Sequence, residues 1–353
     1  MDVGDFDFEL PDELIAQEPP AVRGASRLLV LHRDTGRVEH RRFGDLIEYL
    51  GPGDLLVLNN TRVFPARLLG HRVPSGGAVE CLLLAQLPTG VGSSVEWDAL
   101  VHPGQKLKHG VRMLFERDGI RLHGEILARH FQGRRTVRLW TDGDADVVTA
   151  IDRIGHVPLP PYIKRDDRPS DCDRYQTVYA RDRGSIAAPT AGLHFTSALL
   201  DELAARGVER AEVTLHVGYG TFKPVMTERV EAHQVDPERF TVSAGGAAAI
   251  SRVHTAGRRI VAAGSTTVRA LESLEVADGG SVAASSGDTR IFIYPGHRFR
   301  LVDALLTNFH LPRSSLLMLV AAFAGRDLVL NAYAEAVAKQ YRFYSYGDAM
   351  LIL

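Results

Sequence analysis

Short apolar runs alternate with segments of helical periodicity over much of the chain. Residues 197–206 have the spacing of a helix, with Thr196 or Ser197 as its cap and Gly207 as its stop. A second helix is expected to begin near Thr267. Buried strands are predicted at residues 54–58, 213–217 and 259–263. This strand–helix alternation predicts a layered mixed α/β domain.

The middle of the chain has a different pattern. Residues 68–149 contain short β-rich runs separated by turns such as Pro103-Gly104 and Asp118-Gly119. Strands at this spacing predict a small β-barrel. Because the α/β pattern resumes afterwards, we expect a discontinuous α/β domain, 1–67 and 150–353, with the barrel domain 68–149 inserted. The Gly/Ser/Ala-rich segment 278–288 predicts a loop.

Composition favours a soluble globular protein. Of 353 residues, 45% are hydrophobic and 24% charged. No apolar run approaches the roughly 20 residues of a membrane span, and residues 316–323 predict a buried helix instead. The acidic start 1–5 does not resemble a signal peptide. Cys81 and Cys172 form no metal or disulfide pattern, so we expect a cytoplasmic protein without a membrane anchor.

Charge leaves nucleic-acid binding open. The formal net charge is only -2, which argues weakly against it. However, residues 101–140 hold nine lysines and arginines against three acidic residues. Such a local excess can attract a polyanion, although it can equally be the solvated face of a β-rich module.

Two turns, within residues 188–195 and 215–225, each combine glycine, histidine and threonine. Glycine lets backbone amides approach a ligand closely, and neighbouring hydroxyl and imidazole groups can bind a ligand or transfer protons. Either turn can instead be an ordinary connection with a core histidine. The candidate residues are His194, Thr190, Gly192, His216, Thr221, Gly218, Gly220 and Lys223.

A strand-to-helix turn at residues 264–267 is a candidate anion site. A helix N-terminus presents free amides and a positive dipole, here with Thr266 and Thr267 in its first turn. Arg269 can clamp a carboxylate or a phosphate, and the residue types do not distinguish the two. Alternatively, Arg269 pairs with Glu272 on the same helix face.

Three further polar clusters are candidate binding sites. In the C-terminal cluster, aromatic and guanidinium planes can stack on unpaired RNA bases, or the aromatic residues can belong to the core face of a helix. Asn308 can read a purine edge, and His310 is a third candidate acid or base. The clusters are Asn59, Asn60 and Arg62; Asn308 and His310; and Arg342, Tyr344, Tyr346 and Asp348.

Long ordered strings along nearly the whole chain carry a family resemblance. They include residues 53–63, 188–195, 215–225, 266–273, 307–312 and 341–350. In this order they resemble the S-adenosylmethionine:tRNA ribosyltransferase-isomerase family of queuosine biosynthesis. The resemblance implies an α/β domain with an inserted β-barrel, and a monomer.

The resemblance also implies a reaction. The ribosyl portion of S-adenosylmethionine moves onto 7-aminomethyl-7-deazaguanine at the wobble position of the tRNA anticodon loop and rearranges to epoxyqueuosine, while adenine and methionine leave. S-adenosylmethionine is then a co-substrate, and no metal or other cofactor is implied. Because the sulfonium acidifies the C5′ proton, a base is needed there, for which His194 and His216 are the first candidates. Thr190 and Thr221 are candidates for the ribose hydroxyls.

One segment departs from the family pattern. Glu231 and His233 are candidate catalytic residues there, but Asp236 stands where members usually have a second histidine. The ordinary pKa of an aspartate is about 2.6 units lower than that of a histidine. A paralogue acting on a different acceptor, or a non-catalytic RNA-binding protein, therefore stays an alternative. The spacings of His194, His216, His233 and His310 match no compact zinc pattern.

Overall fold

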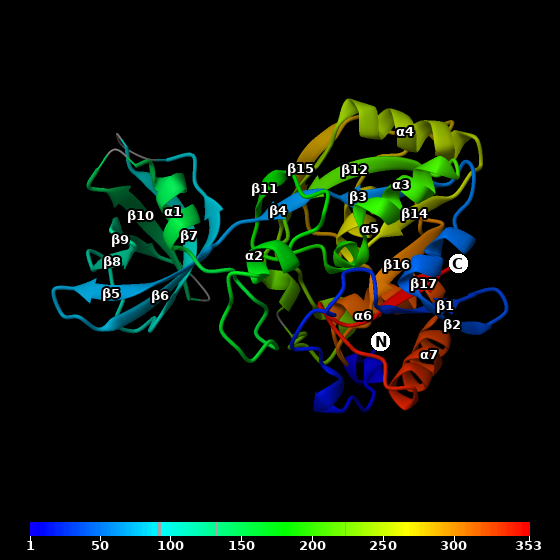
Figure 1. Cartoon of the computed structure of the whole chain (residues 1–353), viewed down its shortest axis with the longest axis horizontal. Helices are drawn as coiled ribbons and strands as arrows, with labels where there is room; N and C mark the ends of the chain where they lie inside the picture. Colours follow the sequence, from blue (N-terminus) through cyan, green and yellow to red (C-terminus); the bar gives the residue numbers. More distant parts are fainter. Residues whose placement is uncertain (90–92, 131–132, 144, 223) are drawn as a thin grey trace.

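The computed structural model describes residues 1–89, 93–130, 133–143, 145–222 and 224–353. Figure 1 shows a larger body built on a mixed sheet and a smaller barrel beside it. The strands of the large sheet are β1 (Arg27–Leu31), β2 (Val38–Arg42), β3 (Leu55–Asn59), β12 (Glu209–Leu215), β13 (Glu238–Val242), β14 (Ile260–Ala263), β15 (Ser285–Thr289), β16 (Ala304–Asn308) and β17 (Ala349–Ile352).

These nine strands lie in the order β15-β13-β12-β3-β14-β16-β17-β1-β2. The central strands β12, β3, β14 and β16 are parallel to one another, with Leu55 opposite both Glu209 and Ile260. Every residue of β3, β14 and β16 is buried. Parallel strands covered on both faces need such continuous apolar runs, which is why the sequence pattern predicts them.

Helices cover both faces of the sheet (Figure 1). Leu55 and Val57 pack on the face covered by α4, α5, α6 and α7, whereas Leu56 and Leu58 pack on the opposite face with α3. Side chains alternate along a strand, so one apolar run serves both cores. The helices are α3 (Ser197–Ala205), α4 (Ala244–Thr255), α5 (Ser265–Glu272), α6 (Ser315–Ala324), α7 (Arg326–Ala338) and the short α2 (Asp171–Arg174).

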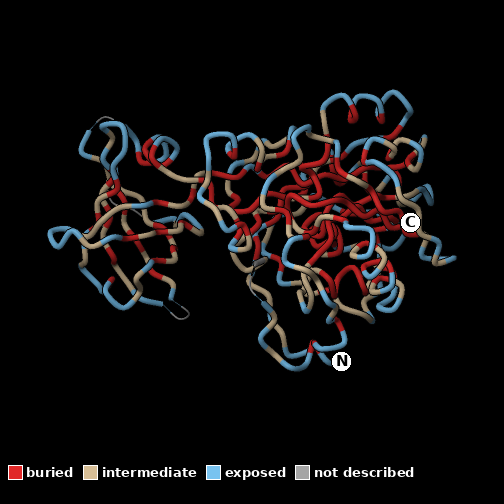
Figure 2. The backbone as a smooth tube through the Cα atoms, turned by 60° about the horizontal axis from the view of Figure 1, so that its bottom comes forward, coloured by how far each residue is buried: buried red, intermediate tan, exposed pale blue. Residues whose placement is uncertain are grey.

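The smaller body is a closed barrel in the order β10-β7-β6-β5-β8-β9. Its interior is a separate buried cluster, visible in Figure 2 apart from that of the large sheet. The helix α1 (Val147–Ile154) packs on it through Ile151 and Ile154. Its strands are β5 (Arg67–Val73), β6 (Ala78–Gln86), β7 (Val95–His102), β8 (Arg112–Arg117), β9 (Ile120–Arg129) and β10 (Arg134–Thr141).

This architecture confirms the predicted fold class of a mixed α/β domain with a small β-barrel. In the sequence, the barrel strands lie between β4 (Thr61–Val63) and β11 (Asp182–Ser185). These two strands pair in parallel on the larger body. The proposed barrel domain 68–149 stays a prediction. The packing of α1 favours a boundary after Ile154 over one at residue 149.

Local predictions have mixed outcomes. The helix at 197–206 is confirmed as α3, where the Thr196 hydroxyl accepts from the Leu199 amide 3.1 Å away. The predicted loop at 278–288 is wrong in its second half, because β15 occupies Ser285–Thr289 and pairs with β13. Backbone pairing with a neighbour creates this edge strand, and a Gly/Ser-rich composition does not reveal it.

No single described helix is long and apolar enough to cross a membrane. Among the described residues, α6 and α7 together reach the necessary length and apolar composition, but the chain bends by 115° between them.

Candidate active site at the carboxyl edge of the sheet

A pocket lies where the central strands end. β12, β14 and β16 end at Leu215, Ala263 and Asn308, and residues at or just beyond these ends line a pocket with about 550 Å³ of empty space, including space open to solvent. This edge is where open α/β sheets bind ligands, because the loops diverge there and helix N-termini face the gap. We call it the central pocket.

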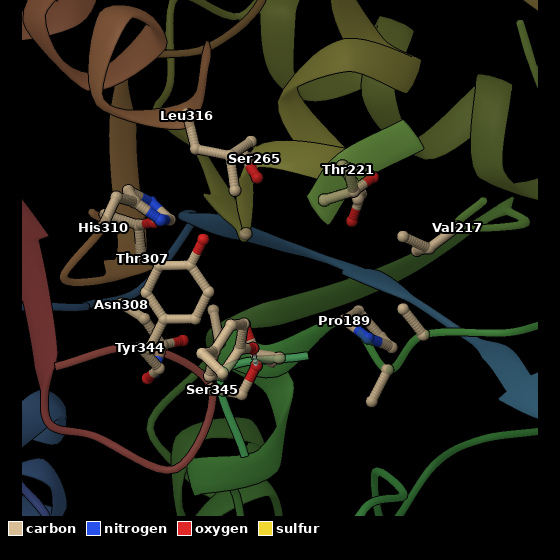
Figure 3. A pocket seen from close by; sticks show the side chains of 17 residues that line it. Pro189, Val217, Thr221, Ser265, Thr307, Asn308, His310, Leu316, Tyr344 and Ser345 are labelled. Atoms are coloured by element: carbon tan, nitrogen blue, oxygen red, sulfur yellow. Dashed lines mark hydrogen bonds between the residues drawn. The ribbon is translucent and has the colours of Figure 1, made fainter. Parts of the chain in front are cut away.

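Six of the predicted site residues line the central pocket. Figure 3 shows the ring of Tyr344 projecting into it, with His310 and Ser265 nearby and Thr221 across from them. Tyr162 and Ser345, which the site prediction omitted, also line it. The six predicted residues are Thr190, Thr221, Thr266, Asn308, His310 and Tyr344.

Asn308 is held in one orientation. Its amide nitrogen Nδ2 donates to Nε2 of His194 at 3.1 Å and to the Tyr344 carbonyl at 3.0 Å. Nδ1 of His194 in turn hydrogen-bonds to the Ser26 hydroxyl at 2.9 Å. The amide atom that faces these two acceptors must be the donor Nδ2. The other amide atom is therefore the carbonyl oxygen Oδ1. Oδ1 is buried without a hydrogen-bond partner among the described residues, so it offers a ligand one oriented acceptor.

His194 lies behind this amide and outside the lining of the central pocket. Burial lowers the pKa of His194 to about 4, so its imidazole is neutral near pH 7. With Nε2 accepting from Asn308, the ring proton belongs on Nδ1. The neutral imidazole of His194 can position Asn308. To exchange a proton directly with a ligand, the His194 side chain would have to reach the cavity.

His310 is the predicted histidine that does line the pocket. Its Nε2 shares a hydrogen bond of 2.8 Å with the Thr307 hydroxyl, and burial lowers its pKa to about 3. The imidazole is therefore neutral and cannot attract an anionic ligand by charge. It can accept or donate one hydrogen bond.

Tyr344 has an uncommon backbone conformation, with φ at 73°. A non-glycine residue at positive φ is strained unless its surroundings hold it. Here its amide donates to the Phe309 carbonyl at 3.0 Å, and its carbonyl accepts from Asn308. Its ring meets that of Tyr162 edge to face, with centroids 3.7 Å apart. These contacts keep one aromatic wall of the pocket in place.

Thr221 connects the central pocket to a buried ion pair. Its hydroxyl donates to Oε1 of Glu238 at 3.0 Å, and the Gly218 amide donates to the same oxygen at 2.9 Å. Oε2 of Glu238 pairs with Nη1 of Arg269. The alternative pairing with Glu272 is wrong, since the Glu272 carboxylate accepts from backbone amides such as that of Leu301.

His216 lies outside the lining of the central pocket. Its Nδ1 shares a hydrogen bond of 2.8 Å with the Thr61 hydroxyl, and burial lowers its pKa. The ring packs closely against Gly184, where an added Cβ would lie 2.7 Å from the imidazole. Gly192 is similarly confined, because a Cβ there would lie 2.1 Å from the hydroxyl of Tyr179.

The asparagines at the end of β3, Asn59 and Asn60, hold neighbouring elements together. Asn59 accepts from the Leu215 amide at 3.0 Å and donates to the Thr266 hydroxyl at 3.2 Å. Asn60 accepts from the Thr214 hydroxyl at 2.7 Å. Their side chains thus bridge neighbouring elements instead of lining the central pocket.

Several other predicted residues lie away from the central pocket. Glu231 is exposed and binds the N-terminal ammonium at 2.6 Å, and the ring of His233 packs edge to face on Phe292. The hydroxyl of Thr267 donates to the Ala263 carbonyl at 2.7 Å. Arg62 is exposed, and Lys223 lies outside the described residues.

The C-terminal cluster contributes Tyr344 to the pocket and otherwise supports the fold. Asp348 accepts from the backbone amides of Arg27 and Arg342, both at 2.8 Å. Tyr346 is buried and donates to Asp171 at 3.1 Å. Their hydrogen bonds tie the last turn of the chain to β1 and to α2.

Within the described part of the chain, no group of three or more histidine, cysteine, aspartate or glutamate side chains is arranged to hold a metal ion.

The barrel surface is less basic than the count of charged residues in its sequence suggests. Arg135 is buried and donates to the Gly104 and Leu107 carbonyls. Arg134 and Arg138 pair with Asp98 and Glu96.

The family model described as "Queuosine biosynthesis protein" matches residues 3–352. The chain belongs to this family. An S-adenosylmethionine:tRNA ribosyltransferase-isomerase of Symbiobacterium thermophilum is 53% identical over 353 residues, covering 100% of both chains. One of Solibacter usitatus is 52% identical over 371 residues, with 100% of both covered. The S-adenosylmethionine tRNA ribosyltransferase structure of Thermotoga maritima is 43% identical, with a TM-score of 0.55, covering 99% of this chain and 100% of that one.

The buried histidines should make the stability of this protein pH-dependent. Burial lowers the pKa of His310 to about 3 and that of His194 to about 4, while unfolded histidine titrates near about 6.5. The unfolded chain therefore binds more protons below about pH 6.5, and stability rises with pH up to that value. His310→Gln should reduce the slope of the unfolding free energy, measured with denaturant, by up to about 1.4 kcal/mol per pH unit near pH 5 and by about half as much near pH 6.5. An unchanged slope would contradict a buried neutral imidazole.

Proposed function

We propose that this protein transfers the ribosyl portion of S-adenosylmethionine to 7-aminomethyl-7-deazaguanine in tRNA and isomerises it, releasing adenine and methionine. Full-length relatives at 50–53% identity that are named for this activity support the proposal. The observation that carries it for this chain is the central pocket, where hydroxyls, an oriented amide and a neutral imidazole converge.

The described lining of the central pocket offers polar groups to a nucleoside and contains no Asp, Glu, Lys or Arg side chain. Oδ1 of Asn308 is placed to accept from an N–H or hydroxyl of the ligand, such as the adenine amino group. The hydroxyls of Thr190, Thr221 and Ser265 line the same cavity and suit ribose hydroxyls. We propose His310 for proton exchange, because its neutral imidazole lines the pocket.

The acceptor is proposed to be the anticodon loop of tRNA. Tyr344 and Tyr162 line the pocket with aromatic rings, and rings of this kind stack on unpaired bases. We further propose that the protein acts as a monomer in the cytoplasm and needs no cofactor besides S-adenosylmethionine as co-substrate.

The test is a reaction with S-adenosylmethionine and tRNA carrying the aminomethyl-deazaguanine. Free adenine and the modified nucleoside, both measured by mass spectrometry, should appear in equal amounts. Adenine without modified tRNA would indicate a paralogue with another acceptor. Salt-sensitive tRNA binding without adenine release would indicate a non-catalytic RNA-binding protein.

His194→Ala should lower turnover at least about tenfold while leaving tRNA affinity nearly unchanged. The change removes the acceptor that orients Asn308, and Asn308 contacts the ligand in this proposal. Because the pKa of His194 is about 4, the pH profile of kcat should keep its shape between about pH 6 and 9. If the pH profile of the variant lacks an ionisation that the wild-type profile shows in that range, His194 transfers the proton directly.

A further inference from the structure

The hydroxyl of Thr221 points in a fixed direction at the wall of the central pocket. Thr221 lies in a short 3₁₀ turn, Tyr219–Phe222, and its amide donates to the Gly218 carbonyl at 3.3 Å. Its hydroxyl donates to Oε1 of Glu238 at 3.0 Å. A threonine hydroxyl has one hydrogen to donate and two lone pairs that accept. Because that hydrogen is given to Glu238, Oγ1 of Thr221 can only accept a hydrogen bond from a ligand.

The carboxylate behind Thr221 keeps this direction from reversing. Glu238 is buried, its Oε1 also accepts from the Gly218 amide at 2.9 Å, and its Oε2 pairs with Nη1 of Arg269. A guanidinium partner and two further donors favour the ionised carboxylate, which has no hydrogen to give back to Thr221. If the Thr221 hydroxyl turned its hydrogen towards a ligand, a buried carboxylate oxygen would lose one of its donors.

The central pocket therefore presents two oriented acceptors to a ligand. Oδ1 of Asn308 is one, and Oγ1 of Thr221 is the other. Both residues line the cavity, Asn308 from the end of β16 and Thr221 from its turn (Figure 3). An N–H or a free hydroxyl satisfies such an acceptor, whereas a phosphate oxygen is itself an acceptor and is repelled, and a C–H group leaves the acceptor unpaired. This arrangement selects a nucleoside whose sugar hydroxyls are free.

We propose that Thr221 is a specificity-determining residue whose Oγ1 accepts a hydrogen bond from a free ribose hydroxyl of S-adenosylmethionine. Glu238 and Arg269 are positioning residues, because they hold the Thr221 hydrogen away from the ligand. This inference rests on the proposed function, which supplies the nucleoside. It adds a requirement on the sugar: the ribose hydroxyl acts as the donor, so a substituent that cannot donate is rejected even if it can accept.

Binding of a ligand series tests the proposal without any turnover. S-adenosylhomocysteine is compared with its 2′-deoxy and 3′-deoxy forms and with the matching fluoro forms, in which fluorine can accept weakly but cannot donate. With unmodified tRNA present, titration calorimetry on the wild-type protein should show, at one of the two positions, both the deoxy and the fluoro ligand binding at least about tenfold more weakly.

Three results of this titration would count against the account in different ways. Full affinity of all four analogues would overturn the proposal. A fluoro ligand that binds as tightly as the hydroxyl ligand, while the deoxy ligand does not, would show that Thr221 donates, and would also overturn it. If S-adenosylhomocysteine itself does not bind, the proposed function fails and the inference fails with it.

Thr221→Val shows whether Thr221 makes the contact. Valine keeps the shape of threonine and lacks the hydroxyl, so the deoxy ligand should bind at least as tightly as the hydroxyl ligand. Thr255→Val is the matched control, because Thr255 is exposed on α4 and its hydroxyl donates to the Ser251 carbonyl at 2.8 Å. This control should keep the tenfold preference. If Thr221→Val keeps it too, another group binds the hydroxyl and the proposal is wrong.

Glu238→Gln tests the positioning role. The glutamine oxygen is drawn to the guanidinium of Arg269, which leaves the amide NH₂ facing Thr221. The Thr221 hydroxyl then loses its acceptor and can donate to the ligand, so the fluoro ligand should gain about threefold over the deoxy ligand, as for a weak hydrogen bond. A purely structural role of Glu238 would weaken both ligands by the same factor, and an unchanged ratio would overturn the positioning role. If this variant does not fold, Thr221→Val still decides.

Discussion

Asn308→Asp should lower kcat/KM by about 10²–10³-fold, a loss typical of a misplaced hydrogen-bonding group at a reaction centre. In the native site Nδ2 donates to His194 and to the Tyr344 carbonyl. A carboxylate has no donor for either acceptor, so it would be repelled from both and would turn. The oriented acceptor Oδ1 would be lost together with its contact to the ligand. Steady-state release of adenine measures the effect.

The matched control is Asn331→Asp on the exposed side of α7. It makes the same chemical change to an exposed residue that does not line the central pocket, and it should leave kcat/KM unchanged. Thermal unfolding of both variants separates a local effect from loss of the fold. If Asn308→Asp is folded and keeps activity within about threefold of wild type, Asn308 does not contact the reacting ligand.

Glu238→Ala should destabilise the protein by about 3–5 kcal/mol. Glu238 is 4% exposed and accepts from Gly218, Thr221 and Arg269. Its removal leaves the buried guanidinium without its counter-charge, and two donors without their acceptor. The free energy of unfolding in urea, compared with that of wild type, measures the cost.

Glu231→Ala is the control for that measurement. Glu231 is also paired, with the N-terminal ammonium, but its side chain is 44% exposed. Water screens such a pair and replaces it when it is broken, so the urea midpoint should not move. Equal shifts for the two variants would contradict the buried character of the pair between Glu238 and Arg269.

The fold was largely predictable because the pattern of apolar residues in most strands shows which of their faces are buried. The run Leu55–Leu58 is apolar throughout, since its side chains serve the cores on both faces of the sheet. The barrel strands alternate, as Ile120–Arg129 does, because only one face is buried. The edge strand Ser285–Thr289 has neither signature, and it is held by its backbone pairing with β13.

The site was less predictable because its contacts join distant parts of the chain. The sequence suggests His194 for proton transfer, but its position behind Asn308, 114 residues away, cannot be read from a motif. Likewise, Arg269 pairs with Glu238, 31 residues away, instead of the nearer Glu272. Ser345 belongs to the segment 341–350 that carries the family resemblance, yet only the tertiary structure brings it and Tyr162 to the pocket.

A crystal structure with S-adenosylhomocysteine and an anticodon stem-loop RNA tests most directly whether the central pocket binds the nucleoside. We expect the adenosine in this pocket, within hydrogen-bonding distance of Oδ1 of Asn308. An adenosine bound elsewhere, or one that leaves Oδ1 of Asn308 without a contact, would contradict the proposed function.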